Sequence, residues 1–174
     1  FDVLYGSEVG KISRILSNGL KDKTSNVIIM LKFLIQINSP YDILEENSKT
    51  YLMHRRSKEI GKKYQNLLSK AEVFAKKSDK LLFFKYGGEL SISAELANEL
   101  CYKFPEKIVV VAYVKGSKVN ISVRGNKIRD IVVKSIVGFE NATAGGHENA
   151  VGAQIRDTDL DIFKKNLEGN IKEI

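Results

Sequence analysis

The fold of the C-terminal half follows from residues 107–125, KIVVVAYVKGSKVNISVRG. KIVVVAYV is a run of apolar, largely β-branched residues, which is typical of a buried strand. KGSK is typical of a turn, and VNISVRG alternates apolar and polar residues as a strand with one covered face does. The stretch therefore predicts a β-hairpin whose second arm ends at Arg124.

Strands and helices alternate on both sides of this hairpin. Upstream, KLLFFKYGG predicts a buried strand, and SISAELANELCYKF predicts an amphipathic helix that stops before Pro105. Downstream, the chain predicts a short helix at 128–139, a glycine-rich loop, a strand at 150–155 and a final helix from residue 158. We therefore expect an α/β fold in which helices flank one mixed β-sheet.

The first 77 residues have helical spacing instead. Apolar residues recur at helical intervals in 7–20 and 26–37, and a short helix is expected after Pro40. Residues 49–77 predict one long helix whose apolar face consists of Met53, Ile60, Tyr64, Leu67, Ala71 and Phe74. We expect two domains, a helical leader with a connector helix at 1–77 and an α/β domain at 78–174.

The composition limits the class of protein. The chain has 174 residues, of which 43% are hydrophobic and 28% charged, as in ordinary soluble domains. Its apolar runs are too short to span a bilayer, so no membrane partner is expected. The single Cys101 excludes an internal disulfide and a multi-cysteine metal site, and it indicates a reducing, cytoplasmic location. The net charge of +7 favours a polyanionic partner such as nucleic acid.

The positive charge is concentrated in the predicted long helix. Residues 49–77 hold nine Lys or Arg against two Glu, a balance equal to the net charge of the whole chain. Five cations recur every seven residues, at Lys49, Arg56, Lys63, Lys70 and Lys77. The stripe is interpreted either as a rail for phosphates or as a solvated helix face, because a charge run alone does not distinguish the two.

A second candidate site lies in residues 142–155, ATAGGHENAVGAQI. Two adjacent glycines, Gly145 and Gly146, let the backbone approach a ligand closely and adopt positive φ. Successive backbone N–H groups can bind an anion, and His147 can add a hydrogen-bond donor. Arg124 can donate two parallel hydrogen bonds to a phosphate. Each residue also has a structural interpretation, namely a tight turn, a satisfied histidine and a surface charge.

The order and spacing of these residues resemble the DHH-associated domain, the C-terminal domain of the DHH phosphoesterase superfamily. That family has a Ser-x-Arg strand end followed by Gly-Gly-Gly-His-x-x-Ala-Ala-Gly-Ala. Ser122 and Arg124 match the first element, and the second is matched by Gly145, Gly146, His147, Ala150, Gly152 and Ala153. Ala144 replaces the first glycine and Val151 an alanine. The resemblance covers residues 80–170 and implies that the matched residues hold a substrate phosphate or nucleic-acid backbone.

The superfamily performs its chemistry in a separate N-terminal domain with an Asp-His-His motif and two metal ions. This chain has only His54 and His147, and His54 has no carboxylate beside it in sequence. Two-metal hydrolysis needs a cluster of carboxylates and imidazoles. We therefore expect no catalytic residue, no metal, no cofactor and no enzyme activity in this chain.

Three functions remain open. The first, which we favour, is a non-catalytic RecJ-like scaffold that binds single-stranded nucleic acid, with DNA expected, in the archaeal replisome with the GINS complex and the MCM helicase. The Lys- and Ile-rich, Trp-free composition resembles that of thermophilic archaea. The second is the substrate-binding part of a DHH nuclease or phosphodiesterase whose metal domain lies before Phe1. The third is a tRNA-associated module, since alanyl-tRNA synthetases carry a related C-terminal domain.

Overall fold

The structure is a computed structural model that describes residues 2–172 and divides into two compact units. The first unit ends at Gln65 and the second begins at Asn66. This boundary lies inside one continuous helix, α4 (Tyr51–Lys77), rather than at its end as the sequence predicted. The difference has a simple cause: the second half of α4 buries Leu68, Ala71 and Ala75, and it therefore belongs to the α/β unit.

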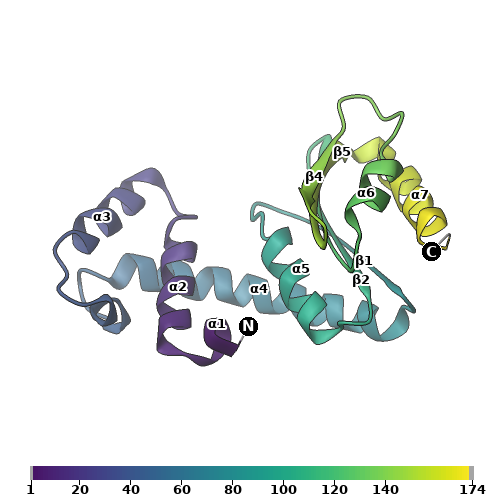
Figure 1. Ribbon diagram of the computed structural model, residues 1–174. Helices are drawn as coiled ribbons and strands as arrows, with labels where there is room; N and C mark the ends of the chain where they lie inside the picture. Colours follow the sequence, from purple (N-terminus) through teal and green to yellow (C-terminus); the bar gives the residue numbers. More distant parts are fainter. Residues whose placement is uncertain (1, 173–174) are drawn as a thin grey trace. The chain divides into compact units, whose positions relative to one another are not determined.

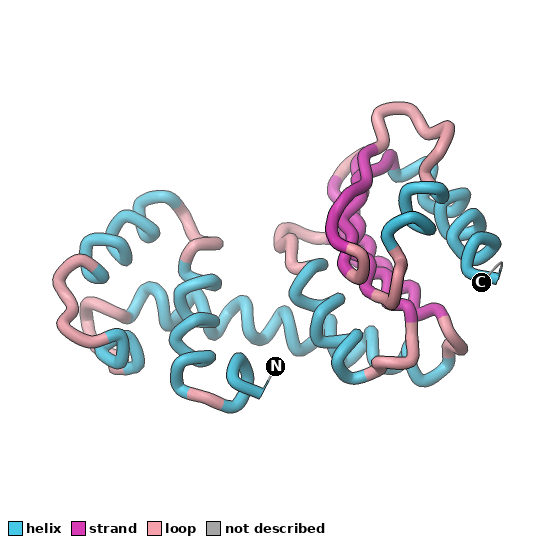
Figure 2. The backbone as a smooth tube through the Cα atoms, viewed as in Figure 1, coloured by secondary structure: helices cyan, strands magenta, loops and turns pink. Residues whose placement is uncertain are grey.

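The described residues of the first unit form helices joined by loops (Figures 1 and 2). It consists of the start of α4 together with α1 (Asp2–Gly6), α2 (Glu8–Gly19), α3 (Thr24–Leu34) and the 3-10 helix η1 (Pro40–Leu44). The Ser7 hydroxyl accepts a hydrogen bond from the Gly10 N–H at 3.1 Å and caps α2. A small core lies between the helices and contains Ile12, Ile15, Met30, Ile43 and Met53.

The second unit is built on a five-stranded sheet in the order β1-β2-β3-β5-β4. The strands are β1 (Leu81–Gly87), β2 (Ile108–Lys115), β3 (Lys118–Arg124), β4 (Thr143–His147) and β5 (Ala150–Arg156). β1 and β2 are parallel and are connected through α5 (Ser93–Lys103), whereas the other neighbours are antiparallel. The mixed sheet with flanking helices confirms the α/β fold class expected from the sequence.

The two faces of the sheet are covered differently. α6 (Arg129–Ser135) and α7 (Leu160–Lys172), which follows the 3-10 turn η2 (Asp157–Asp159), cover one face, and α5 packs on β2 and β3 at the other (Figure 1). The α6–α7 face buries the odd-numbered residues of β3 and β5, including Ile121, Val123 and Ile155. The even-numbered residues of β3 and β5 therefore point to the face that carries α5.

Two sequence expectations are corrected here. The glycine-rich segment that was predicted as a loop is the edge strand β4, because Thr143–His147 pairs along its length with β5. The sequence did not predict this strand because two of its five residues are glycine, which lowers strand propensity. The predicted apolar face of α4 is also partly wrong: Phe74 is 57% exposed, whereas Leu68 and Ala75 are buried. Within residues 2–172, no helix combines the length and apolar composition needed to cross a bilayer.

Candidate nucleic-acid interface

The sheet register places the residues of the two sequence motifs side by side. Residues that pair across neighbouring strands share one face of a sheet. Arg124 pairs with Ala150, which pairs with His147, and Ser122 pairs with Gly152, which pairs with Gly145. In the next row, Asn120 pairs with Gln154, which pairs with Thr143. These nine positions share one face of the sheet across β3, β5 and β4, which we call the motif face.

The motif face is open over its β4 side. α5 packs mainly on β2 and β3. Thr143, Gly145 and His147 of β4 are exposed, as is Gly152 of β5. Figure 1 shows β4 and β5 at the edge of the sheet, with α6 and α7 to their right. A ligand therefore has access to the backbone of both strands.

Arg124 borders this open area and is held in place. Its Nε donates to the Asn98 Oδ1 at 2.7 Å, and its Nη1 donates to the Val123 carbonyl oxygen at 2.8 Å. Burial lowers the pKa of the guanidinium, an effect that the nearby Cys101 opposes. An arginine stays charged in proteins despite such a shift, so the site presents a partly desolvated, pre-oriented cation.

Ser122, which matches the phosphate-binding motif in sequence, is a buried residue in the structure. It is 8% exposed, and its hydroxyl donates to the Ser93 Oγ at 3.1 Å. Ser93 is the first residue of α5, so this hydrogen bond connects the helix to the β3 side of the motif face. We conclude that Ser122 supports the surface and orients α5.

The two glycines of β4 have separate roles. Gly146 has φ of +144°, and a Cβ there would lie 2.4 Å from the Ala150 carbonyl oxygen, so the hairpin itself requires glycine. Gly145 needs no positive φ, and an added Cβ would meet nothing within 4 Å. A Cβ on its partner Gly152 would come no closer than 4.0 Å to another residue, at the Gly145 carbonyl oxygen. The fold does not require these two glycines, and together they leave bare backbone in the middle of the motif face.

The basic stripe of α4 is not uniform. The Arg56 Nε and Nη2 donate to the Lys21 carbonyl oxygen at 3.2 and 2.7 Å, and its Nη1 contacts the Glu59 carboxylate at 3.4 Å. Arg56 therefore satisfies a carbonyl just beyond the end of α2, as basic side chains commonly do. Lys63, Lys70 and Lys77 are exposed on α4.

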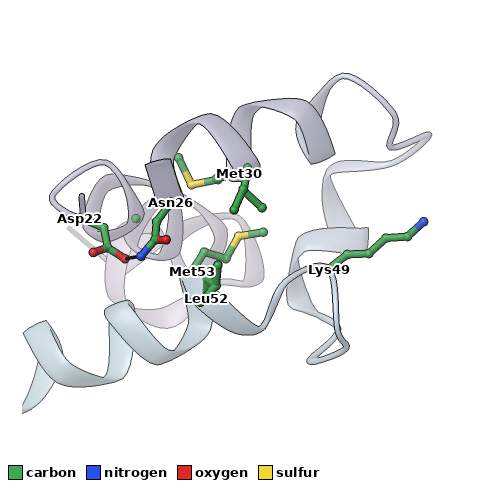
Figure 3. Close-up of a pocket in the computed structure, with 8 residues that line it drawn as sticks. Asp22, Asn26, Met30, Lys49, Leu52 and Met53 are labelled. Carbon is green, nitrogen blue, oxygen red and sulfur yellow. Dashed lines mark hydrogen bonds between the residues drawn. The ribbon is translucent and has the colours of Figure 1, made fainter. Parts of the chain in front are cut away.

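Lys49 precedes α4 and borders a small hollow in the first unit. The hollow holds about 10 Å³, room for a single water, and Gly19, Asn26 and Met30 also line it. Figure 3 shows the Lys49 side chain extended away from Met30 and Met53, with Asp22 accepting a hydrogen bond from the Asn26 amide at 2.9 Å. The size of the hollow excludes a nucleotide.

His54 is a structural residue. It is 5% exposed, its Nε2 donates to the Ile43 carbonyl oxygen at 2.8 Å, and its Nδ1 lies 3.7 Å from the Glu46 carboxylate. These contacts connect η1 to α4 within the first unit. Throughout the described range 2–172, no group of three or more His, Cys, Asp or Glu side chains is arranged to hold a metal ion.

Comparison with known families identifies the domain that carries the motif face. Residues 70–173 match the DHHA1 domain, which is more than half of the chain. The chain belongs to the DHHA1 domain family. The matched region begins inside α4 and includes the whole sheet, so the motif face is part of the DHHA1 domain.

Solved structures share this fold at low sequence identity. RecJ of Thermus thermophilus in complex with Mn²⁺ is 13% identical with a TM-score of 0.65, and the match covers 99% of this chain and 24% of RecJ. The pGpG-specific phosphodiesterase PggH of Vibrio cholerae is 15% identical with a TM-score of 0.60, over 99% of this chain and 62% of PggH. CDC45 of Entamoeba histolytica is 11% identical with a TM-score of 0.51, over 97% and 38%. A search of curated protein sequences gave no match.

The chain spans less than two thirds of each of these three proteins. At these identities the likeness establishes a RecJ-like fold for the DHHA1 domain and the helices before it. The function has to follow from the residues of the motif face.

Sequence reasoning missed three polar residues around the motif face. Asn98 orients Arg124, and the Gln154 Nε2 donates to the Asn120 Oδ1 at 2.8 Å. Asn120 could have been found, because the alternation in VNISVRG places it on the same face as Ser122 and Arg124. Asn98 and Gln154 had no such signal, since only tertiary packing brings α5 and β5 beside β3.

Proposed function

We propose that this chain binds single-stranded nucleic acid, with DNA as the expected form, through the motif face of its DHHA1 domain. The observation that carries this proposal is the register that brings Arg124, the bare backbone of Gly145 and Gly152, and His147 together on one open surface. A fixed cation beside backbone that no side chain covers allows a phosphodiester to approach closely and pair with the guanidinium. The net charge of +7 favours the same partner.

We further propose that the chain is a non-catalytic scaffold of the archaeal DNA replication machinery, in the cytoplasm, with the GINS complex and the MCM helicase as protein partners. Two observations support this. The fold is similar to that of CDC45, and the described residues present no metal-binding cluster. Affinity purification from the source organism with mass spectrometry tests the proposal, and recovery of GINS and MCM subunits is expected.

Nucleic-acid binding is tested by titration. Fluorescence anisotropy of labelled single-stranded DNA should show saturable binding that weakens with salt, as phosphate contacts require. Arg124→Ala should weaken binding, whereas Lys165→Ala is the control because Lys165 is an exposed cation of α7, which covers the opposite face. Equal losses in both variants would mean that only overall charge matters and would refute the assignment to the motif face.

A separate observation supports a second function. The match covers only 24% of RecJ and 62% of PggH, which fits the substrate-binding part of a DHH-family nuclease or phosphodiesterase. In that case the motif face would hold substrate against a metal domain encoded before Phe1. The reading frame upstream of Phe1 separates the two functions, because an Asp-His-His cluster there would favour the enzyme.

A further inference from the structure

A row of three cations continues the motif face at its far end. Lys115 pairs with Lys118 across β2 and β3, and Lys118 pairs with Arg156 across β3 and β5. Lys118 lies two residues before Asn120 in β3, and Arg156 lies two residues after Gln154 in β5. Their side chains therefore lie on the same face of the sheet as those of Asn120 and Gln154. The motif face thus has Arg124 at one end and this row, which we call the cation row, at the other.

The arrangement of the cation row is unfavourable by itself. Like charges placed opposite each other on neighbouring strands repel. Arg156 forms an ion pair, in which its Nη2 lies 2.9 Å from the Glu140 carboxylate. Glu140 is 77% exposed, and such an exposed pair is weak and readily exchanged for another anion. A phosphate placed between Lys118 and Arg156 would relieve the repulsion.

A hollow lies beside the cation row. It has a volume of about 560 Å³, which falls among pockets that hold small molecules, roughly 300–1,000 Å³. Its lining combines two cations with amide and hydroxyl groups and consists of Ser117, Lys118, Asn141, Gln154, Ile155, Arg156, Asp157 and Thr158. Asp157 is the one carboxylate in this lining, and its Oδ1 lies 3.5 Å from the Lys85 Nζ. The hollow therefore offers donors for a phosphate beside space for a base.

We infer that the hollow and the cation row form a second contact for the same nucleic-acid strand, which would enter the motif face at Arg124 and leave it at Lys118 and Arg156. This inference rests on the proposed function. From Arg124 to Lys118 is six residues of β3, or about 20 Å. At about 3.4 Å for each nucleotide of a stacked strand, that distance corresponds to roughly six nucleotides. A short oligonucleotide would reach only one end.

The test compares two probes at fixed salt, a 5′-phosphorylated thymidine dinucleotide and a thymidine octanucleotide. The parent should bind the octanucleotide more tightly. The double variant Lys118→Ala/Arg156→Ala should lose about tenfold or more in octanucleotide affinity and keep its dinucleotide affinity. Its salt slope for the octanucleotide should fall by about 1.4, for two phosphate contacts on a single strand. Lys165→Ala/Lys172→Ala on α7 removes the same charge from the opposite side of the sheet and should change neither probe.

Glu140→Gln provides an independent variant in case the double variant melts at a lower temperature. Removal of the competing carboxylate should tighten octanucleotide binding and leave the dinucleotide unchanged, and unchanged octanucleotide binding would contradict the inference. A uridine octanucleotide run in parallel shows whether the strand is DNA or RNA.

The outcomes distinguish a failure of the second contact from a failure of the proposed nucleic-acid binding. If Arg124→Ala weakens both probes but Lys118→Ala/Arg156→Ala binds like the parent, the second contact is refuted and the proposed function stands. Equal weakening by the α7 control would also refute the second contact, since the effect would then be one of net charge. A parent that binds neither probe would overturn both.

Discussion

Arg124 and His147 lie in the same row of the sheet, on either side of Ala150, although β3 and β4 are separated in sequence by α6. The row brings a pre-oriented guanidinium and an exposed imidazole to the same end of the motif face. In the next row, Gly145 and Gly152 leave the backbone uncovered. This relationship leads to the first two predictions.

Arg124 should contribute both charge and geometry to binding. Arg124→Ala should cost about 1.5–3 kcal/mol in the free energy of single-stranded DNA binding, as for a charge-assisted contact. Arg124→Lys should recover only part of this, because lysine lacks the fork. Asn98→Ala keeps the charge but removes the acceptor of Nε, so a smaller loss of about 0.5–1.5 kcal/mol is expected. Anisotropy titrations measure all three, and an unaffected Arg124→Ala variant would exclude the motif face as the binding surface.

The two glycines of β4 should respond in opposite ways. Gly145→Val should keep its melting temperature, since open space surrounds that position, but should lose binding because the side chain blocks the approach to the backbone. Gly146→Ala should destabilise the domain by about 1–3 kcal/mol, because its φ of +144° and the nearby Ala150 carbonyl exclude a Cβ. Melting curves beside titrations distinguish them. Normal binding by a folded Gly145→Val variant would show that the backbone is not contacted.

The exposed cations of α4 should differ from Arg56. Lys63→Glu, Lys70→Glu and Lys77→Glu together should weaken nucleic-acid binding and reduce the salt slope by up to about 0.7 for each phosphate that the helix no longer binds. Arg56→Ala should lower the melting temperature instead, since its guanidinium holds the Lys21 carbonyl. If the triple variant keeps the parent's slope, the stripe is a solvated face or contacts a protein.

The chain by itself should not hydrolyse phosphodiesters. Residues 2–172 contain no arrangement of His, Cys, Asp or Glu that would hold a metal ion, and two-metal hydrolysis requires one. Incubation with Mn²⁺ and labelled single-stranded DNA, short RNA or a cyclic dinucleotide measures this. Turnover that co-purifies with the chain and is absent from a mock preparation would contradict the prediction.

Stability should fall at high pH through Tyr86. Burial raises the pKa of Tyr86 to about 12, with smaller contributions from Tyr113 and Glu95, although the Ile92 N–H that donates to its oxygen acts in the opposite direction. Because the pKa of the unfolded tyrosine is about 10, the stabilisation is complete below pH 10 and is lost as the pH rises towards 12. The melting temperature should therefore decrease across this window, and less steeply in Tyr86→Phe. Equal slopes for both proteins would assign the decrease to other groups.

Local pattern was sufficient for most of the fold. The continuous apolar run of β2, the alternation in β3 and the helical spacing of α4 and α5 each depend on residues close in sequence, so they predicted elements that the structure contains. The same local order identified Arg124, Gly145 and His147 as candidates. Local pattern did not predict the strand β4, because a glycine-rich edge strand is stabilised by pairing with β5 rather than by its own strand propensity.

Tertiary structure alone decided which candidates share a surface. Pairing across β3, β5 and β4 aligns Arg124 with His147 and Lys118 with Arg156, and no local periodicity encodes that register. It also places Ser122 under α5 and Arg56 beside the Lys21 carbonyl, so these two predicted binding residues make internal hydrogen bonds. The physical reason is that side-chain direction is a local property of a strand or helix, whereas exposure and partners depend on which distant segments pack against it.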